Sequence, residues 1–573
     1  MDVTPTAEEL VSLFERRELA SQMACRFGAM QGVDNHVVEK HCITLHNAGV
    51  IDLFILVEDN SLQELGVTDF FRASHFFCRL LPELDATPER MMRCIDRLVT
   101  RGGQDGAANE PNAAFREWCA RVPERADEVI AAAHKGHELA CHHLVFALEA
   151  SSNVIEARRI ATEYEDNRRQ AAIAALGRIE HPDADSRNET FAIFNTLLDC
   201  GIDDSVKAGL LHASMQILAC GDVISSVGGS ALISRLVVNP GPFTIHQCAV
   251  ALWAYEKALI PEIVTFLLDA LAHLDSANKG TVDALDIGLQ TLLELGHDEA
   301  AISFVTRLLS RPDDDLELEA LGSFSRALLS GSLDLLSRVV VQWLELGAPR
   351  LCGGLANVIQ GPGLDGVPLN LKAEDLALSP LVQLFICRKA IGWFFFKPTT
   401  AASVLVSVLR TCDANTAQEV KSLLVDPLLQ NYDGIREYLE SLAPDDSASR
   451  AVISALAQNE VYLEAIRTVP LIIELQPSEH HRRMESLRIS DQMRNAHQKA
   501  ESESTFLNMV SRSVLLYGNR SLSFVDDGQD NRRPIEVELH SHGISYEMPR
   551  MEVVDPVGLD CILRTFRQER MEK

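Results

Sequence analysis

The sequence predicts a mostly α-helical protein built around an α-solenoid, an array of stacked helical hairpins. Apolar residues make up 47% and charged residues 23% of its 573 residues, as in a folded chain. Aromatic residues make up only 6%, while Leu and Ala recur throughout, so we expect a core of aliphatic side chains on helices rather than aromatic-rich strands. A regular spacing of helix breaks in the middle of the chain supports the same fold class.

The helix breaks fall at Gly221, Ala258, Gly296 and Gly331, at intervals of 37, 38 and 35 residues. The helix-like stretches before them read HASMQILA, CAVALWAYEK, ALDIGLQTLLEL and ALGSFSRALL. The last three breaks are followed by IVTFLLDALAHL, AAISFVTRLLS and LLSRVVVQWLEL. Two apolar helices per unit at this period are typical of stacked hairpins, because each unit buries its apolar faces only against its neighbours.

This period and helix pairing resemble those of the HEAT and armadillo class of helical-repeat proteins over roughly residues 113–475. The resemblance lies in period and pairing, since no consensus residue repeats strictly. It implies an extended surface that binds other proteins, which is an analogy at the level of the fold.

The remaining chain is expected to form three parts around this array. Residues 1–100 form a small helical domain, and residues 476–509 form a polar connecting helix, because this stretch is helix-prone yet polar on nearly every side. Residues 510–573 form a small α+β module. Its short alternating runs SVLLYG, RSLSFVD, RPIEVELH and GISYEM precede a final helix that Asp555 caps and Pro556 opens.

Within the first part, Asn60–Leu84 resembles the end of a sterile alpha motif domain. Glu64–Val67 supplies a turn and Arg72–Leu84 a long amphipathic helix. The usual glycine-histidine pair before that helix is replaced by Phe70 and Phe71. The resemblance implies self-association or pairing with another small helical domain.

The charge balance argues against nucleic acid and membrane partners. The chain has 52 basic and 82 acidic residues, a formal net charge of −30, which repels phosphate backbones and anionic headgroups. The nearest candidates for a basic patch, Arg482-Arg483 and Arg532-Arg533, are flanked by acidic or polar residues. Proteins are therefore the expected partners.

The chain also looks cytoplasmic. The beginning, MDVTPTAEEL, has acidic residues where a signal peptide needs basic ones. The apolar stretch Leu381–Pro398 carries Arg388, Lys389 and Lys397, which favours a buried helix over a bilayer crossing. The 13 cysteines are scattered singly without a CxxC pair, as expected of reduced, buried thiols.

One stretch, AHKGHELACHHL at residues 133–144, concentrates four histidines, a cysteine and a glutamate. On an uninterrupted helix, His134, His137, Glu138 and Cys141 would share one face, which is a metal-ligand geometry.

Two features of this stretch weaken that geometry. Gly136 lies inside it, and HELACHHLVFALEAS is similar to the amino-terminal domain of Clp-type unfoldases, which implies a turn through residues 139–142. We therefore interpret the stretch as a helix-turn-helix junction and assign no metal site, with His134, His137 and Cys141 as the candidates if a metal binds.

Other motifs carry less chemistry. His540 and His542 would lie on the same face of a strand as half of a zinc site, without a second ligand pair nearby. Gly361–Gly366 matches GxGxxG, but Pro368 prevents the helix that a nucleotide site needs, so we expect a loop. The acidic run Asp313–Asp315 is expected to complement the amino-terminal end of the following helix.

The sequence thus predicts a non-enzymatic scaffold or adaptor without a cofactor, because GxSxG, HExxH and GxxxxGK[ST] motifs are all missing. Its acidic solenoid surface would bind protein partners, with self-association as a further possibility. Two alternatives remain open: a metal-binding sensor or metal-dependent subunit, and an accessory scaffold of a bacterial multigene complex such as an antiviral defence system.

Overall fold

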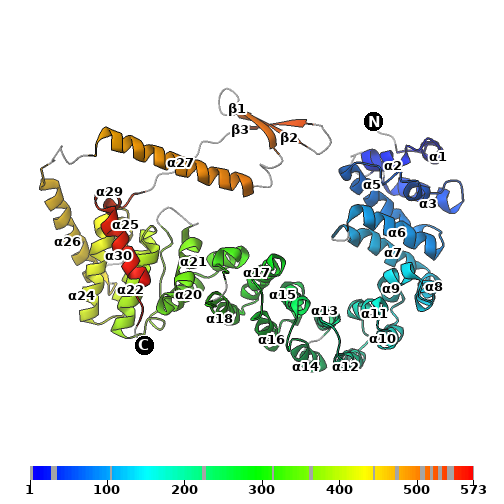
Figure 1. Ribbon diagram of the computed structural model, residues 1–573, viewed down its shortest axis with the longest axis horizontal. Coiled ribbons are helices and arrows are strands. Elements are labelled where there is room, and N and C mark those ends of the chain that lie inside the picture. The colour runs from blue at the N-terminus through cyan, green and yellow to red at the C-terminus, as the bar shows by residue number, and fades with distance from the viewer. Residues whose placement is uncertain are drawn as a thin grey trace. The chain divides into compact units, whose positions relative to one another are not determined.

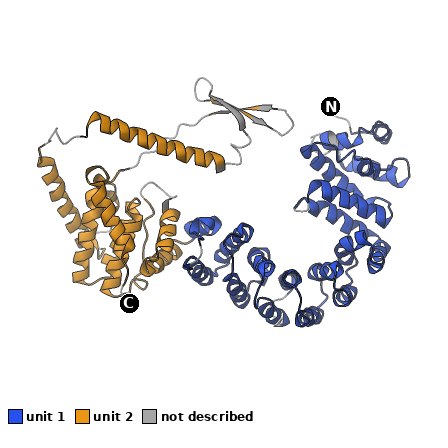
Figure 2. Ribbon diagram, in the orientation of Figure 1, with its two compact units in different colours: residues 1–331 blue, residues 332–573 orange. Residues whose placement is uncertain are grey.

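The computed structural model describes residues 4–27, 35–103, 106–221, 227–312, 315–360, 366–442, 446–470, 477–503, 510–515, 520–526, 532–538 and 547–571. The chain is mostly α-helical and forms an α-solenoid of helical hairpins, as predicted (Figure 1). It divides into two compact units, residues 1–331 and 332–573 (Figure 2). This division coincides with the predicted helix break at Gly331. The predicted domain boundaries near residues 100–113 and 475–510 stay predictions.

Unit 1 consists of helices and short helical turns. In chain order they are α1 (Ala7–Glu15), α2 (Leu19–Gln22), η1 (Met23–Phe27), α3 (Asn35–Asn47), α4 (Ile55–Glu58), α5 (Val67–Leu80), η2 (Leu81–Glu83), α6 (Pro88–Gly102), η3 (Gly106–Ala108), α7 (Asn109–Arg121), α8 (Pro123–His134), α9 (Glu138–Ser151), α10 (Val154–Glu163), α11 (Asn167–Arg178), α12 (Ala184–Asp199), α13 (Asp204–Cys220), α14 (Val227–Leu236), α15 (Pro242–Ala254), η4 (Glu256–Ala258), α16 (Pro261–Leu271), α17 (Lys279–Glu294), α18 (Asp298–Leu309), η5 (Leu318–Ala320) and α19 (Gly322–Ser330).

Many of these helices begin at a residue whose side chain accepts a hydrogen bond from a backbone N–H of the first turn. Such capping satisfies donors that have no partner inside the helix. The capping residues in unit 1 are Thr6, Thr87, His137, Asn153, Asp166, Asp183, Asp203 and Asn278. The starts of these eight helices are therefore favoured by the local sequence.

The resemblance to a sterile alpha motif predicted the turn before α5 correctly but misplaced the helix. The helix begins at Val67 and ends at Leu80, whereas Arg72–Leu84 was expected. Phe70 and Phe71 lie inside its first turns, with Phe70 buried and Phe71 43% exposed. Burying Phe70 at this position favours extending the helix through the residues that were expected to precede it.

From α8 to α19 the helices form two layers. The inner layer consists of α9, α11, α13, α15, α17 and α19, which pack closely on one another along the inner side of unit 1 (Figure 1). The outer layer consists of α8, α10, α12, α14, α16 and α18, which contact one another more loosely. The seven helices predicted from apolar stretches between residues 212 and 346 are confirmed as α13, α15, α16, α17, α18, α19 and α20.

Hydrogen bonds between neighbouring repeats span the same number of residues as the sequence period. The Asp286 carboxylate of α17 accepts hydrogen bonds from the backbone N–H groups of Ser323 and Phe324, at 2.8 and 2.9 Å, 37 and 38 residues further along. His297 contacts the Leu259 carbonyl, 38 residues away, at 3.0 Å. The period of the sequence is thus a period of contacts in space.

Unit 2 contains further helices and a small sheet. Its elements are α20 (Leu333–Leu346), α21 (Pro349–Gln360), α22 (Pro380–Phe394), α23 (Pro398–Leu409), α24 (Ala414–Leu423), η6 (Leu424–Leu429), α25 (Ile435–Glu440), α26 (Ser449–Thr468), α27 (Glu479–Glu503), β1 (Val510–Leu515), β2 (Arg520–Asp526), β3 (Arg532–Glu538), α29 (Arg550–Val554) and α30 (Pro556–Gln568).

Most of the apolar stretch Leu381–Pro398 is a largely buried helix, α22, which ends at Phe394 and packs against α20, α21, α23, α24 and α30. The segment after Gly366 is not helical, as expected from Pro368. Its backbone N–H groups donate hydrogen bonds to hydroxyls of α23, from Val367 to Thr400 and from Leu369 to Ser403, both at 2.9 Å. This explains why α23 can be almost fully buried despite its hydroxyl residues.

The predicted connecting helix is α27, which is exposed along nearly its whole length. The first three of the four predicted strand-like runs form an antiparallel sheet in the order β1-β2-β3, with Val514 opposite Leu522 and Leu522 opposite Glu536. Most of GISYEM lies outside the described residues. The last helix begins as predicted, with Asp555 accepting a 2.9 Å hydrogen bond from Gly558 N–H, and it packs on α22.

No single helix in the described part of the chain is both long and apolar enough to cross a bilayer, and α19 and α20 reach that length and apolarity only when taken together. The prediction that the cysteines are buried is confirmed for only some of them. Seven are buried, whereas Cys25, Cys200, Cys220 and Cys561 are exposed. All 13 are free thiols.

Candidate functional site

The histidine stretch forms a helix-turn-helix junction between α8 and α9. Helix α8 ends at His134, and Gly136 adopts a left-handed conformation with φ of 78°. Helix α9 begins at Glu138, and the imidazole of the preceding His137 accepts a 3.3 Å hydrogen bond from Ala140 N–H. The uninterrupted helix that a shared metal-binding face required is therefore not present. The turn lies at residues 135–137, not at 139–142 as the unfoldase resemblance implied.

The junction sends its candidate ligands to different partners. His134 contacts the Tyr164 hydroxyl at 2.8 Å through Nδ1 and the Glu156 carboxylate at 2.7 Å through Nε2. The Cys141 thiol points to the Ala133 carbonyl at 3.6 Å. The described residues bring no three His, Cys, Asp or Glu side chains into a group that could hold a metal ion. His540 and His542 lie outside the described residues.

The contacts of His134 tie α8 to α10 and to the turn that follows α10. Hydrogen bonds from Arg159, together with that from His134, hold the pKa of Glu156 below its ordinary value against the opposing effect of burial. Arg168 lies over the Tyr164 ring, with its guanidinium carbon 3.7 Å from the ring centroid, and donates to the Ala133 carbonyl at 3.3 Å. This polar cluster therefore stabilises the packing of two repeats.

His143 of α9 is buried in the core. Its side chain is 1% exposed and lies beside the ring of Phe115, 5.0 Å between ring centroids. Burial lowers the pKa of His143 to about 4. The imidazole is therefore neutral at physiological pH and acts as a core residue.

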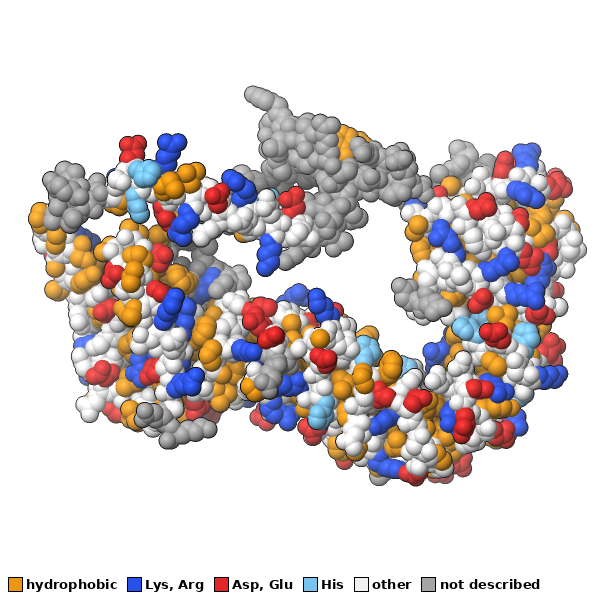
Figure 3. All heavy atoms as spheres, viewed as in Figure 1, with side chains coloured by type: hydrophobic (Ala, Val, Ile, Leu, Met, Phe, Trp, Pro, Cys, Tyr) orange, Lys and Arg blue, Asp and Glu red, His pale blue; other side chains and the backbone are white. Residues whose placement is uncertain are grey.

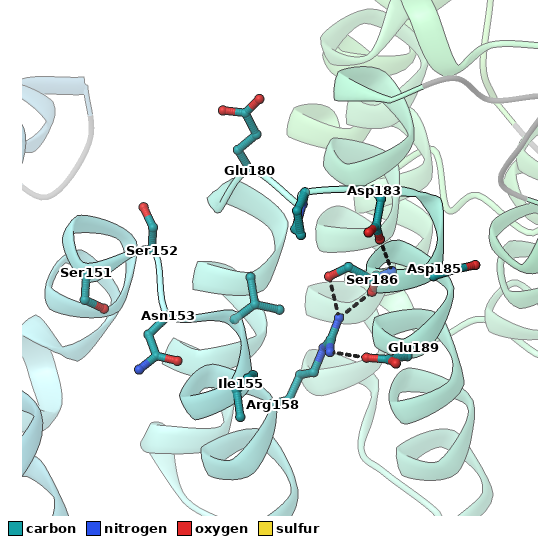
Figure 4. Close-up of a pocket in the computed structure, with 12 residues that line it drawn as sticks. Ser151, Ser152, Asn153, Ile155, Arg158, Glu180, Asp183, Asp185, Ser186 and Glu189 are labelled. Atoms are coloured by element: carbon teal, nitrogen blue, oxygen red, sulfur yellow. Dashed lines mark hydrogen bonds and ion pairs between the residues drawn. The ribbon is translucent and has the colours of Figure 1, made fainter.

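A pocket of about 740 Å³ lies between the α9–α10 turn and the start of α12 (Figure 4). Arg158 points across it from α10 and donates to the Glu189 carboxylate at 2.6 Å and to the Ser186 hydroxyl at 2.9 Å. Asp183 caps α12 by accepting from Ser186 N–H at 2.7 Å. Arg158 thus joins α10 to α12, while the Asp183 carboxylate caps α12 itself. We therefore interpret the pocket as a junction between repeats.

The inner layer of unit 1 presents a face of exposed and half-buried side chains, which we call the inner face. It is made by residues spaced three or four apart on each helix, the positions left between the contacts with the two neighbouring inner helices. Its members are Glu138, His142 and Val145 on α9; Gln170, Ala174 and Arg178 on α11; Ala208, His212 and Gln216 on α13; Phe243, His246, Val250 and Trp253 on α15; Asp283, Ile287, Gln290 and Glu294 on α17; and Arg326 on α19. The inner side of unit 1 mixes hydrophobic, basic, acidic and histidine side chains (Figure 3).

Polar contacts link α9 to α7 and α11, and α13 to the end of α15. Glu149 accepts a 2.6 Å hydrogen bond from Arg116 and lies 3.7 Å from Arg178. On the next helices, His212 contacts the Tyr255 hydroxyl at 2.9 Å. Burial, with Arg178 nearby, lowers the pKa of His212, and burial raises that of Tyr255 to about 12. The imidazole of His212 and the hydroxyl of Tyr255 are therefore both neutral, and their contact positions α13 against the end of α15.

Three large apolar residues of the inner face are exposed, although solvent-facing positions of a helix are usually polar. Phe243 is 64% exposed, Trp253 40% and Ile287 45%. The first two belong to α15, a helix that is apolar around most of its circumference. That pattern is visible in CAVALWAYEK, but within the sequence it indicates only a helix, because it does not tell which apolar residues stay exposed.

Taken together, fold and surface define a helical-repeat protein of the α-solenoid type with an exposed inner face. No protein-family model matches the chain, and no curated protein matches it. Among solved structures the chain is similar to a circular tandem repeat protein with novel repeat topology and enhanced subunit contact surfaces. The identity is 13%, the match covers 80% of this chain and 98% of the other, and the TM-score is 0.19, too low to carry an argument about function.

Proposed function

We propose that this protein is a non-enzymatic scaffold or adaptor that binds a protein partner along the inner face of unit 1. The exposure of Phe243, Trp253 and Ile287 on adjacent inner helices supports the proposal. Clustered aromatic and aliphatic side chains that remain in water are typical of surfaces that a partner covers.

The partner that fits this face best is an amphipathic helix with basic flanks. Asp283 and Glu294 lie on the same stripe of α17 as Ile287, one on each side of it. A helix with an apolar stripe would cover Trp253 and Ile287, and its Lys or Arg residues would lie near these two carboxylates. The chain's net charge of −30 favours the approach of such a basic partner. Several repeats can supply the roughly 1,600 Å² that a standard interface buries.

The resemblances to known helical families belong to the same proposal. The two-layer packing of hairpins supports the resemblance to HEAT and armadillo repeats, and the turn before α5 supports the resemblance to a sterile alpha motif, with self-association as its implication. We expect no cofactor, no nucleic acid or membrane partner, and a cytoplasmic location. The alternative of a metal sensor draws no support from the α8–α9 junction, because Gly136 interrupts the helix it needed.

A pair of matched variants tests the proposal. The first combines Trp253→Ala with Ile287→Ala on the inner face. The second combines Ile155→Ala with Val238→Ala, which also removes exposed apolar side chains of unit 1, 77% and 60% exposed, but away from the inner face. The wild-type chain and both variants are each expressed in the native organism and purified under native conditions. The copurifying proteins are then quantified by mass spectrometry.

The wild-type chain and the control should retain one stoichiometric partner, and the inner-face variant should lose at least 90% of it while keeping its far-UV circular dichroism and thermal midpoint. The partner's binding segment should be an amphipathic basic helix, which a synthetic peptide of that segment confirms by direct titration. A wild-type chain that recovers no stoichiometric partner, or a partner that both variants retain equally, would contradict the proposal.

A further inference from the structure

The last described segment of the chain, residues 547–571, packs on the helices of unit 2 in the manner of a bound peptide. At its start, the Glu547 carboxylate accepts hydrogen bonds from the backbone N–H groups of Asp433 and Gly434, at 2.6 and 2.9 Å. Met551 N–H donates to the Asn431 side chain at 2.8 Å. We call residues 547–571 the tail.

The helix of the tail, α30, docks through one face onto α22 (Figure 1). Leu559 and Leu563 are 1% and 5% exposed, and they share this face with Phe566. A side chain at Gly392 of α22 would place its Cβ 3.1 Å from Phe566 Cβ, so glycine allows the two helices to meet. The spacing of these apolar residues is that of a helix lying in a groove.

Two adjacent basic residues of α22 recognise the carboxyl-terminal end of α30. Lys389, which is fully buried, donates to the backbone carbonyls of Arg567 and Glu569, both at 2.7 Å. Arg388 binds the Glu569 carboxylate with two nitrogens, at 2.8 and 2.6 Å. A cation at this end of a helix satisfies carbonyls that lack a partner and complements the helix dipole.

The tail contributes a basic contact of its own. The Arg567 guanidinium lies over the Trp393 ring, 5.2 Å from its centroid, and Nε donates to the Gly392 carbonyl at 2.5 Å. We call the surface of α22 around Arg388, Lys389, Gly392 and Trp393 the α22 groove. It binds, in order along the tail, an apolar stripe, a helix end and an acidic residue.

The connection to this tail is long. Helix α26 ends at Thr468 and the tail begins at Glu547. Between them α27 is exposed along nearly its whole length, and at 1.5 Å per residue it alone spans about 37 Å. A tether of this length is long enough for the tail to reach a groove on another molecule as well as its own. The effective concentration of the tail at its own groove also falls as the tether lengthens, which weakens the competition from its own chain.

We propose that the tail is an exchangeable docking element: the α22 groove binds the tail of a second copy, so that two chains are joined by reciprocal exchange of residues 547–571. The contacts in such a dimer are those that the tail makes within one chain, so exchange requires no new interface chemistry. This assembly mode is independent of the partner proposed for the inner face of unit 1.

Charge reversal separates binding within one chain from binding between chains. Arg388→Glu and Glu569→Arg each place like charges together within their own chain. In a 1:1 mixture, the acidic groove of the Arg388→Glu chain meets the basic tail of the Glu569→Arg chain, and the unchanged groove of the second meets the unchanged tail of the first. Both exchanged contacts are therefore complementary, while both internal ones are repulsive. Arg564→Glu, on an exposed position of α30, is the matched control for charge reversal.

Light scattering should give the mass of one chain for each single variant and the mass of two chains for the mixture. Hydrogen exchange of residues 556–568 should be fast in the single variants and slow again in the mixture. The combined variant Arg388→Glu/Glu569→Arg should behave as the wild type at every concentration, and so should Arg564→Glu. A mixture that keeps the mass of one chain overturns the proposal.

A second measurement does not depend on charge reversal. A fluorescent peptide of residues 547–571 is titrated into the full wild-type chain and into Gly392→Leu, whose side chain blocks the position of Phe566. Saturable binding to the wild type, at least tenfold weaker for Gly392→Leu, is expected. An absence of binding to the wild type at 100-fold excess of peptide, after incubation long enough for the tail to dissociate, also overturns the proposal.

Discussion

The Thr244 hydroxyl donates a 2.6 Å hydrogen bond to the Asp204 carboxylate, although the two residues lie 40 positions apart. Asp204 opens α13, and its carboxylate also accepts from the backbone N–H groups of Gly241 and Phe243, at 2.9 and 2.7 Å. One carboxylate thus caps the first turn of α15, the next inner helix. Gly241 fits here because a Cβ would lie 2.4 Å from the carboxylate carbon.

Replacing Asp204 by Ala should destabilise unit 1 by about 1–2 kcal/mol, because it removes the cap of a neighbouring helix. The measurement is the urea midpoint followed by far-UV circular dichroism. Asp269→Ala is the control, since Asp269 is 62% exposed and lies 3.6 Å from Arg307, and it should change stability by less than about 0.5 kcal/mol. Equal midpoints for the two variants would refute the capping role.

The same site predicts a pH dependence. Although partial burial alone would raise it, the pKa of Asp204 is lowered by hydrogen bonds from Thr244 and from the backbone of α15. A lowered pKa means that the carboxylate stabilises the fold above its ordinary pKa near 3.9 and loses this contribution as the pH falls through the folded value. Asp204→Asn should therefore reduce the slope of stability against pH below about pH 4, which urea titrations at several pH values measure.

His143 also predicts that acid destabilises the fold, but through a buried neutral base rather than through a carboxylate that loses its charge. Its pKa falls from 6.5 to about 4 on burial, so the unfolded chain binds a proton that the folded chain excludes. The fold should lose stability as the pH falls from about 6.5, with the loss levelling off below about 4, on the order of 3 kcal/mol at 1.36 kcal/mol per pKa unit. His143→Leu should flatten this part of the profile. An unchanged profile between pH 6.5 and 4 would show that His143 does not carry the effect.

Two glycines with similar backbone conformations should respond differently to alanine. Gly136 has φ of 78° with no atom within 4 Å of an added Cβ, so Gly136→Ala should cost only the backbone strain, about 1–2 kcal/mol. Gly347 has φ of 62°, and its Cβ would lie 2.7 Å from Phe385 Cζ. Gly347→Ala should cost about 1–3 kcal/mol more because of overpacking. Thermal midpoints of the two variants test the order.

The hydroxyls of α23 give a further prediction. Ser403 accepts the buried N–H of Leu369 at 2.9 Å, so Ser403→Ala should destabilise unit 2 by about 1–3 kcal/mol by leaving that donor without a partner. Ser422 on α24 is exposed, and Ser422→Ala should change stability by less than about 0.5 kcal/mol. If the two variants unfold at the same urea concentration, the hydroxyl of Ser403 is not needed to satisfy Leu369.

The predicted helices agree well with the structure where local signals decide. Apolar spacing located α15 to α18 and α20, and Asp555 with Pro556 located the start of α30, because capping and helix periodicity act within a few residues. The break of the helix at Gly136 has the same origin, since a left-handed residue is a local event. The start of α5 was missed because burial of Phe70 against its neighbours overrode the local motif.

The sequence by itself determined the fold class, the repeat period and the positions of most helices, since these follow from short-range spacing of apolar and capping residues. Only the tertiary structure decided which face of each helix stays exposed and that Asp204 caps a helix one repeat away. It also decided that Lys389 donates to the carbonyls of Arg567 and Glu569, 178 and 180 residues further on. These relationships depend on which distant segments meet in space. The pattern within a single helix does not predict them, because the burial of Lys389 and the exposure of Trp253 depend on which residues of other helices lie opposite.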